Sequence, residues 1–194
     1  MQKGTTTAFL DTKPHYELLD GLRGVAALMV IWYHIFEGFA TSPMDQRFNH
    51  GYLAVDFFFI LSGFVIGYAY DDRWKTMKTK DFFKRRLIRL HPMVVLGAVL
   101  GSITFCIQGC EKWDGSQVSI SMVMLAMLMG IFLIPVAPGA GPEVRGNGEM
   151  YPLNGPSWSL FFEYIGNILY ALFIRKLSTK ALTVLVVLAG IGLA

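Results

Sequence analysis

Charged residues are scarce in this chain of 194 residues, of which only 16% are Asp, Glu, Lys or Arg. A soluble domain carries about 25% charged residues, so the deficit argues against an ordinary soluble fold. Hydrophobic residues make up 54% of the chain, and the mean hydropathy is +0.47. These residues gather in long apolar runs, which is typical of an integral membrane protein.

Cysteine is also rare, because Cys106 and Cys110 are the only two in the sequence. Their spacing places them one helical turn apart, where a disulfide would distort the helix. A metal site would need more ligands than this pair offers. We interpret both as packing residues and expect no metal or redox cofactor.

We expect no cleavable signal peptide, since the first seventeen residues are polar and no small-residue cleavage site follows the first apolar run. We expect residues 1–17 to form a cytoplasmic N-terminal tail and residues 18–194 to form a transmembrane domain. The last apolar run has fourteen residues, whereas a span needs about twenty, so this domain is expected to be incomplete at its C-terminus. The predicted fold is all-α, a polytopic membrane helix bundle with about five to six transmembrane helices. The expected segments are Leu18–Phe39, Tyr52–Tyr70, Pro92–Gln108, Val118–Val136, Pro156–Ile174 and Ala181–Ala194.

Basic residues set the expected orientation. Lys and Arg outnumber acids eight to three in Asp71–His91, expected as a loop or interfacial helix. Short basic loops stay cytoplasmic, which places this segment and the N-terminus inside. Counting spans then puts the basic turn Arg175–Lys180 outside, against the same rule. Either Val118–Val136 is re-entrant or the rule fails here, and we favour Arg175 inside.

Two ionisable residues, Arg23 and His34, lie in the first apolar run. Eleven residues correspond to three turns plus about 20° and to about 16 Å along the axis, so both lie on one helix face. Ionisable groups at membrane depth indicate function by default, and His34 is the candidate for proton transfer, oriented by Glu37. Asp20 either pairs with Arg23 or caps the helix. The structural alternatives are that Arg23 snorkels to the interface and that His34 makes a helix–helix hydrogen bond.

The second run combines Asp56 with aromatic residues and the small pair Ser62 and Gly63. Small residues allow helices to approach closely, and packing is the role we expect for this pair. Ser62 would act as a nucleophile only beside a base.

Arg85, Arg86 and Arg89 form a basic cluster within about one helical turn. Several guanidiniums together make a fork that suits phosphate groups. The alternative is that the cluster sets topology and binds lipid head groups.

The fifth run begins near Pro156, a residue that suits a helix start. Glu163 follows about two turns later, where an unpaired carboxylate is costly in an apolar helix. It should therefore pair with Arg, His or a sugar hydroxyl. A purely structural ion pair is the alternative to a functional role.

Together these motifs resemble the membrane-bound acyltransferase-3 family. They occur in the family's order over about residues 18–175. The four stretches are Leu19–Gly24 leading to His34, Val55–Phe59 with Ser62–Phe64, Arg85–Pro92, and Pro156–Leu160 with Glu163.

The resemblance implies an acyl-CoA-dependent O-acyltransferase that modifies surface polysaccharides, lipids or glycosides. It implies that His34 is catalytic and Arg23 essential, and we add Glu163 to this catalytic set. It further implies that Arg86 and Arg89, and with them Arg85, meet the CoA phosphates on the cytoplasmic side. The remaining motif residues are expected to bind substrate or support the site: Asp20, Asp56, Ser62, Gly63, Trp158 and Ser159.

The expected co-substrate is acyl-CoA, in the first instance acetyl-CoA, and the expected acceptor is a carbohydrate or lipid-linked molecule. We expect no tightly bound cofactor and no nucleic-acid partner, and a location in a bacterial inner membrane. Family members usually have more spanning helices than this chain, so a missing C-terminal half is a further expected partner. The alternative function is a non-catalytic membrane protein, such as a carrier or a truncated remnant.

Overall fold

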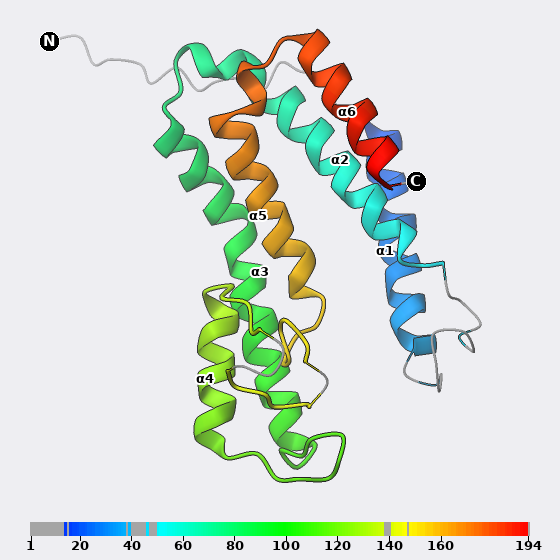
Figure 1. Ribbon diagram of the computed structural model, residues 1–194, viewed down its shortest axis with the longest axis vertical. Coiled ribbons are helices and arrows are strands. Elements are labelled where there is room, and N and C mark those ends of the chain that lie inside the picture. Colours follow the sequence, from blue (N-terminus) through cyan, green and yellow to red (C-terminus); the bar gives the residue numbers. More distant parts are fainter. Residues whose placement is uncertain are drawn as a thin grey trace, which may run out of the picture. The chain divides into compact units, whose positions relative to one another are not determined.

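The computed structural model describes residues 14, 16–37, 39, 46, 50–137, 141–146 and 148–193. The chain divides into two compact units, Met1–Ile60 and Leu61–Ala194. Helix α2 (Leu53–Tyr70) contributes its first half to one unit and its second half to the other (Figure 1). Most of the expected tail 1–17 and of the expected loop 40–50 lies outside the described residues.

The first unit is built on helix α1 (Glu17–Glu37). Its first turn carries two acids, which is favourable beside the positive N-terminal end of the helix dipole. The side-chain amide of Gln46 donates to the backbone oxygen of Tyr33 at 2.8 Å. A Cβ atom at Gly51 would lie 2.5 Å from the Cβ of Tyr33, so only glycine permits this close return of the chain to α1.

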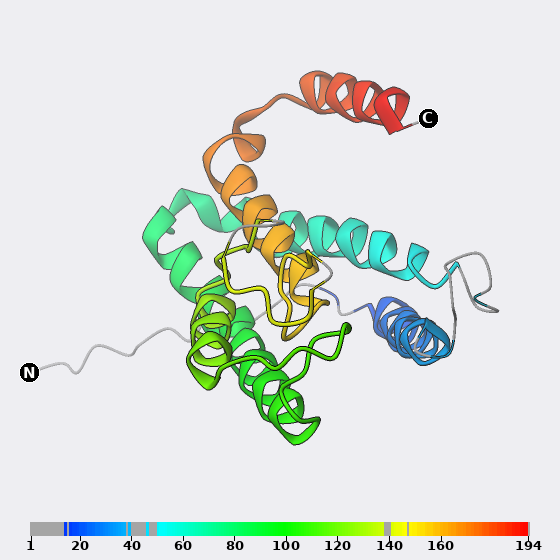
Figure 2. The ribbon, with the colours of Figure 1, turned by 60° about the horizontal axis from the view of Figure 1, so that its bottom comes forward.

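The second unit is helical along most of its length. After α2 come a short 3-10 turn η1 (Asp71–Lys75), the long helix α3 (Thr79–Ile107), α4 (Ile120–Ile131), α5 (Ser157–Leu172), a second turn η2 (Ile174–Lys176) and α6 (Thr179–Leu193). Helix α3 contacts α4 near its C-terminal half and α5 near its N-terminal half (Figures 1 and 2). It is therefore the axis on which this unit is assembled.

An aromatic cluster joins the ends of three helices. Phe82 of α3 is fully buried, and its ring centroid lies 4.9 Å from that of Tyr70, 5.2 Å from Trp74 and 5.8 Å from Tyr170. The indole nitrogen of Trp74 donates to the Tyr170 hydroxyl at 3.1 Å, and that hydroxyl donates to Asp71. The end of α2, the start of α3 and the end of α5 consequently meet at one end of the unit, named here the basic end.

Arg175 lies at this same end. Its guanidinium carbon is 4.0 Å from the ring centroid of Trp74, and its Nε donates to the backbone oxygen of Ala171 at 2.6 Å. This contact brings together the two basic segments 71–91 and 175–180, which contain eleven of the chain's 17 Lys and Arg residues. Segment 108–156 contains two basic and four acidic residues. A single orientation can satisfy the positive-inside rule for the whole unit.

Helix α4 has 12 residues, or about 18 Å, and is too short to cross a bilayer. Its Val123 clusters with Phe105 near the C-terminal end of α3, and a Cβ at Gly130 would lie 3.4 Å from Ala98. Helix α3 ends away from the basic end, and segment 108–156 leads from there to the start of α5, which lies beside the middle of α3 (Figure 1). The apolar run Val118–Val136 therefore does not form one full-length helix.

The segment that follows α4 folds back onto α3 at two glycines. A Cβ at Gly97 would lie 2.3 Å from the side-chain nitrogen of Asn154, and one at Gly101 would lie 2.0 Å from the backbone oxygen of Leu153. Gly97 and Gly101 are four residues apart, the spacing that usually lets two helices approach. Here the two glycines instead let the backbone of a non-helical segment lie close to α3.

Tyr151 closes this returning segment. Its hydroxyl donates to the backbone oxygen of Leu133 at 2.9 Å, and the amide of Val136 donates to Met150. Burial raises the pKa of Tyr151 to about 12. Because the folded state favours the neutral phenol, this contribution to stability is complete below the usual pKa of about 10 and is lost as pH rises through about 12.

Helix α3 corrects one expected boundary, between the basic stretch and the third span. The third span was expected to begin at Pro92, but α3 begins at Thr79 and contains Pro92. An interior proline removes one backbone hydrogen bond, and the helix continues because residues before it, including Phe82 and Arg86, bury their side chains. The basic stretch expected as a loop or interfacial helix is thus partly the start of a 29-residue helix.

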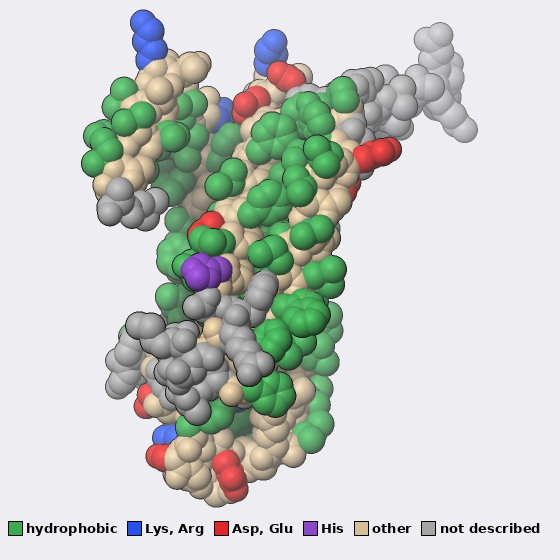
Figure 3. Space-filling model, turned by 90° about the vertical axis from the view of Figure 1, so that its right-hand side faces the viewer, with side chains coloured by type: hydrophobic (Ala, Val, Ile, Leu, Met, Phe, Trp, Pro, Cys, Tyr) green, Lys and Arg blue, Asp and Glu red, His purple; other side chains and the backbone are tan. Residues whose placement is uncertain are grey.

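Hydrophobic side chains cover much of the helix surface, as Figure 3 shows for one face. Four helical segments of the described chain are long and apolar enough to cross a membrane, namely Glu17–Glu37, Leu53–Lys75, Thr79–Ile107 and Ser157–Lys176. Helices α4 and α6 are apolar but shorter. The all-α polytopic bundle is confirmed, and the count of five to six helices is approximate, since four helices of the described chain are long enough to cross and two are shorter.

The shared position of the two basic segments can be tested by labelling single cysteines with a membrane-impermeant maleimide. In a background with Cys106 and Cys110 replaced by Ser, we expect Lys78→Cys and Lys176→Cys to react from one side of the membrane. Ser116→Cys, in the segment between α3 and α4, should react from the other side. Reaction of Lys176→Cys together with Ser116→Cys would contradict the arrangement.

The seat for the returning segment can be tested at Gly101. We expect Gly101→Ala to destabilise the protein by about 1–3 kcal/mol, because overpacking forces the Leu153 backbone away from α3. Thermal unfolding in detergent provides the measurement. Gly166→Ala is the matched control, since a Cβ there meets nothing within 4 Å and Ala favours helix by up to about 1 kcal/mol. Equal stabilities for the two variants would argue against the close contact.

Candidate functional site

Two ionisable pairs lie on α1, within the first unit. Arg23 lies 3.4 Å from Asp20, and the Nδ1 atom of His34 lies 2.8 Å from an oxygen of Glu37. His34 is in the last turn of α1, so it lies nearer to the helix end than the sequence suggested. Its side chain is 45% exposed, which leaves the imidazole accessible.

The contact between His34 and Glu37 has a chemical consequence. An ionised carboxylate only accepts hydrogen bonds, so the neutral imidazole must donate from Nδ1. The proton-free nitrogen is then Nε2, which is the atom able to take a proton from a hydroxyl. A carboxylate beside Nδ1 also stabilises the imidazolium that such a transfer forms.

Asp56 lies in the first turn of α2 and its side chain is exposed. A carboxylate at this position is favourable beside the helix N-terminus. A Cβ at Gly63 would meet no described atom within 4 Å. Among the described residues, close approaches of other segments occur instead at Gly51, Gly97 and Gly101.

Three motifs that are far apart in the sequence converge on Glu163, within the second unit. The Ser62 hydroxyl donates to Oε1 of Glu163 at 2.9 Å, and an Nη atom of Arg86 donates to the same oxygen at 2.7 Å. The side chain of Arg86 is 3% exposed and that of Glu163 is 22% exposed. A buried charge is stable only with such a partner, so this pairing explains how α3 and α5 both carry charge at their interface.

Polar atoms beside Glu163 add to this network. The side-chain nitrogen of Asn167 donates to the backbone oxygen of Glu163 at 2.7 Å. Three buried atoms have no hydrogen-bond partner within the described part of the chain: Arg86 Nε, the Tyr164 hydroxyl and Asn167 Oδ1. Unpaired buried polar atoms are uncommon in proteins, so their grouping marks this interface as unusual.

The three arginines of the basic cluster do not share one environment. Arg85 and Arg89 are exposed, whereas Arg86 is buried against Glu163. On a helix, Arg85 and Arg89 point within about 40° of each other, and Arg86 points about 100° away from Arg85. Only Arg85 and Arg89 therefore offer accessible guanidinium groups to an anion.

Trp158 and Ser159 begin helix α5. The Ser159 hydroxyl donates to the backbone oxygen of Pro156 at 2.9 Å, which pairs a carbonyl at the start of the helix. The Trp158 ring is 40% exposed and meets Phe162 edge-on with centroids 6.1 Å apart. Trp158, Ser159 and Glu163 all lie on α5.

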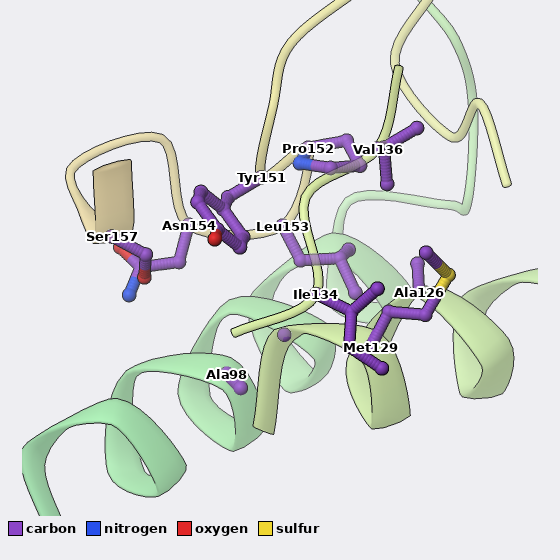
Figure 4. Close-up of a pocket in the computed structure, with 11 residues that line it drawn as sticks. Ala98, Ala126, Met129, Ile134, Val136, Tyr151, Pro152, Leu153, Asn154 and Ser157 are labelled. Carbon is purple, nitrogen blue, oxygen red and sulfur yellow. The ribbon is translucent and has the colours of Figure 1, made fainter. Parts of the chain in front are cut away.

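Two cavities of the second unit lie between α3 and α4. Figure 4 shows one between α3, α4 and segment 151–157, with Tyr151, Asn154 and Ser157 among its lining residues. Its volume is about 10 Å³, room for about one water molecule. A larger groove of about 430 Å³ between α3 and α4 is lined by apolar residues with Ser102 and Cys106. Neither has the charged groups that acyl transfer from CoA would use.

Sequence reasoning missed several residues of these networks. Asn167 could have been found, because it is a polar residue one turn from Glu163 in an apolar helix. The spacing of Gly97 and Gly101 was also visible in the sequence. The contacts of Asp71, Tyr170 and Arg175 had no such signal, since they join segments about a hundred residues apart.

Comparison with known proteins gives a consistent result. A family model described as an acyltransferase domain matches residues 16–194. "Protein 2 in picA locus" of Rhizobium radiobacter is 35% identical over 165 residues, which cover 79% of this chain and 80% of that protein. No solved structure matches the chain significantly.

Two relatives are longer than this chain. "Acyltransferase MdmB" of Streptomyces mycarofaciens is 29% identical over 179 residues, which are 84% of this chain and 41% of that protein. A protein of Staphylococcus aureus (strain COL) named "Putative O-acetyltransferase" is 39% identical over 95 residues, 46% of this chain and 14% of its own length. The matched region is thus less than half of each of these two proteins.

Proposed function

The chain belongs to the acyltransferase-3 family, and on this premise we propose that it transfers an acyl group, in the first instance acetyl, from acyl-CoA to a hydroxyl group. The acceptor would be a surface carbohydrate or a lipid-linked molecule. The family and the apolar helices support an integral-membrane O-acyltransferase. The observation that carries the finer proposal is the contact of 2.8 Å between His34 Nδ1 and Glu37.

In this mechanism His34 is the general base. Its Nε2 takes the proton of the acceptor hydroxyl while the hydroxyl oxygen attacks the thioester carbon. The carbon–sulfur bond then breaks, and the proton returns to the leaving sulfur to give CoA thiol and the acyl ester. Glu37 holds the imidazole and stabilises its protonated form. The variant in which His34 carries the acyl group itself uses the same residues.

Arg23 completes the proposed catalytic set on α1. Arg23, held by Asp20, would bind the pantetheine arm or the thioester. From the sequence Glu163 was expected in the same set, whereas its carboxylate pairs with Arg86 inside the second unit. The donor is anionic, and the exposed Arg85 and Arg89 lie toward the basic end, which the positive-inside rule assigns to the cytoplasm. The cytoplasmic side would therefore offer positive charge to the CoA phosphates and direct access to acyl-CoA.

The proposal predicts that His34→Ala lowers the rate of acyl transfer by about 10²–10⁴-fold, the usual contribution of general base catalysis. The assay uses membranes that contain the chain, radiolabelled acetyl-CoA, and counting of label in glycan and lipid fractions. Glu37→Gln should give a smaller loss, since Nε2 remains but the imidazolium is less stabilised.

His50→Ala provides the matched control, because His50 is also in the first unit but lies against Tyr52, with ring centroids 6.1 Å apart. It should transfer at the wild-type rate. Unchanged transfer by a His34→Ala protein that is present in the membrane at the normal level would rule out His34 as the base.

A further inference from the structure

Arg86 differs from its two neighbours in the basic cluster. It is 3% exposed, and its charge is neutralised by Glu163 at 2.7 Å. A guanidinium already paired with a buried carboxylate attracts a phosphate group less than a free one does, because the pair carries no net charge. The side chain that points inward is therefore poorly suited to contact the donor.

Glu163 instead ties three helices together. One carboxylate oxygen accepts from Ser62 on α2 and from Arg86 on α3, and the carboxylate itself belongs to α5. Removal of either charge leaves the other without its counter-ion at a largely buried position, which is unfavourable. The pair consequently fixes the rotation of α3 about its own axis.

This rotation determines where the exposed arginines point. Arg85 and Arg89 lie about 100° and 60° from Arg86 around α3. If α3 turns, both guanidinium groups move with it. We infer that Arg86 is a positioning residue anchored by Glu163, and that Arg85 and Arg89 are the groups that contact the phosphates of the acyl donor. This inference rests on the proposed function.

The test is a double-mutant cycle on KM for acetyl-CoA and on kcat, with Arg86→Gln, Glu163→Gln and the double variant. Each single variant should raise KM by about tenfold. The KM of the double variant should not exceed the higher KM of the two single variants, because all three variants lose the same ion pair. The value of kcat should stay within about threefold of wild type. Arg85→Gln and Arg89→Gln should also raise KM. Glu143→Gln, which removes a negative charge in segment 141–146, should leave KM unchanged.

Glu163→Gln is the decisive variant, because it removes no positive group. If Arg86→Gln raises KM but Glu163→Gln does not, Arg86 contacts the donor directly and the inference is wrong. If Glu163→Gln lowers kcat with KM unchanged, Glu163 takes part in the chemistry and the inference is also wrong. If the wild-type protein shows no transfer, the proposed function is wrong and this inference is wrong with it. In the two outcomes above the wild-type protein is active, so the failures can be told apart.

A second double variant tests the inference if the single variants fail to fold. The variant Arg86→Met with Glu163→Met removes both charges together, and such replacements of buried pairs often keep proteins folded. It should unfold thermally near the wild-type temperature and show the same increase in KM. A wild-type KM in this folded variant would overturn the inference.

Discussion

The packing of the second unit depends on the carboxylate of Glu163, which requires a charged or polar partner. Glu163 lies near the middle of an apolar helix, where an unpaired charge would be strongly unfavourable. Arg86 and Ser62 satisfy one of its oxygens from two other helices. Because apolar side chains give little preference among helix contacts in lipid, this polar contact specifies which faces of α2, α3 and α5 meet.

A second set of contacts specifies the end at which they meet. The cluster around Phe82 closes the basic end with aromatic packing, and Arg175 covers the Trp74 ring there. Gly97 and Gly101 let the segment that follows α4 pack closely against α3, away from the basic end. The distribution of charge follows from these contacts, since they bring both basic segments to one side.

The sequence predicted the helices well and their boundaries less well. Long apolar runs have few alternatives to helix in a membrane, so each expected span corresponds to a helix. An apolar run does not show how much of it is helical, and in Val118–Val136 the helix α4 covers only 12 residues. Pro92 was taken as a boundary because its local effect is unfavourable, whereas burial before it sustains the helix.

The residues of the candidate site could be named from the sequence, but their partners could not. Glu163 was expected to pair with Arg, His or a sugar hydroxyl, and the structure selects Arg86. Three arginines within about one turn have the same chemistry, and nothing in their order tells which one points inward. That choice depends on the rotation of α3 against α5. It matters for function, since an inward arginine acts on helix packing while an outward one remains charged and accessible to an anionic ligand.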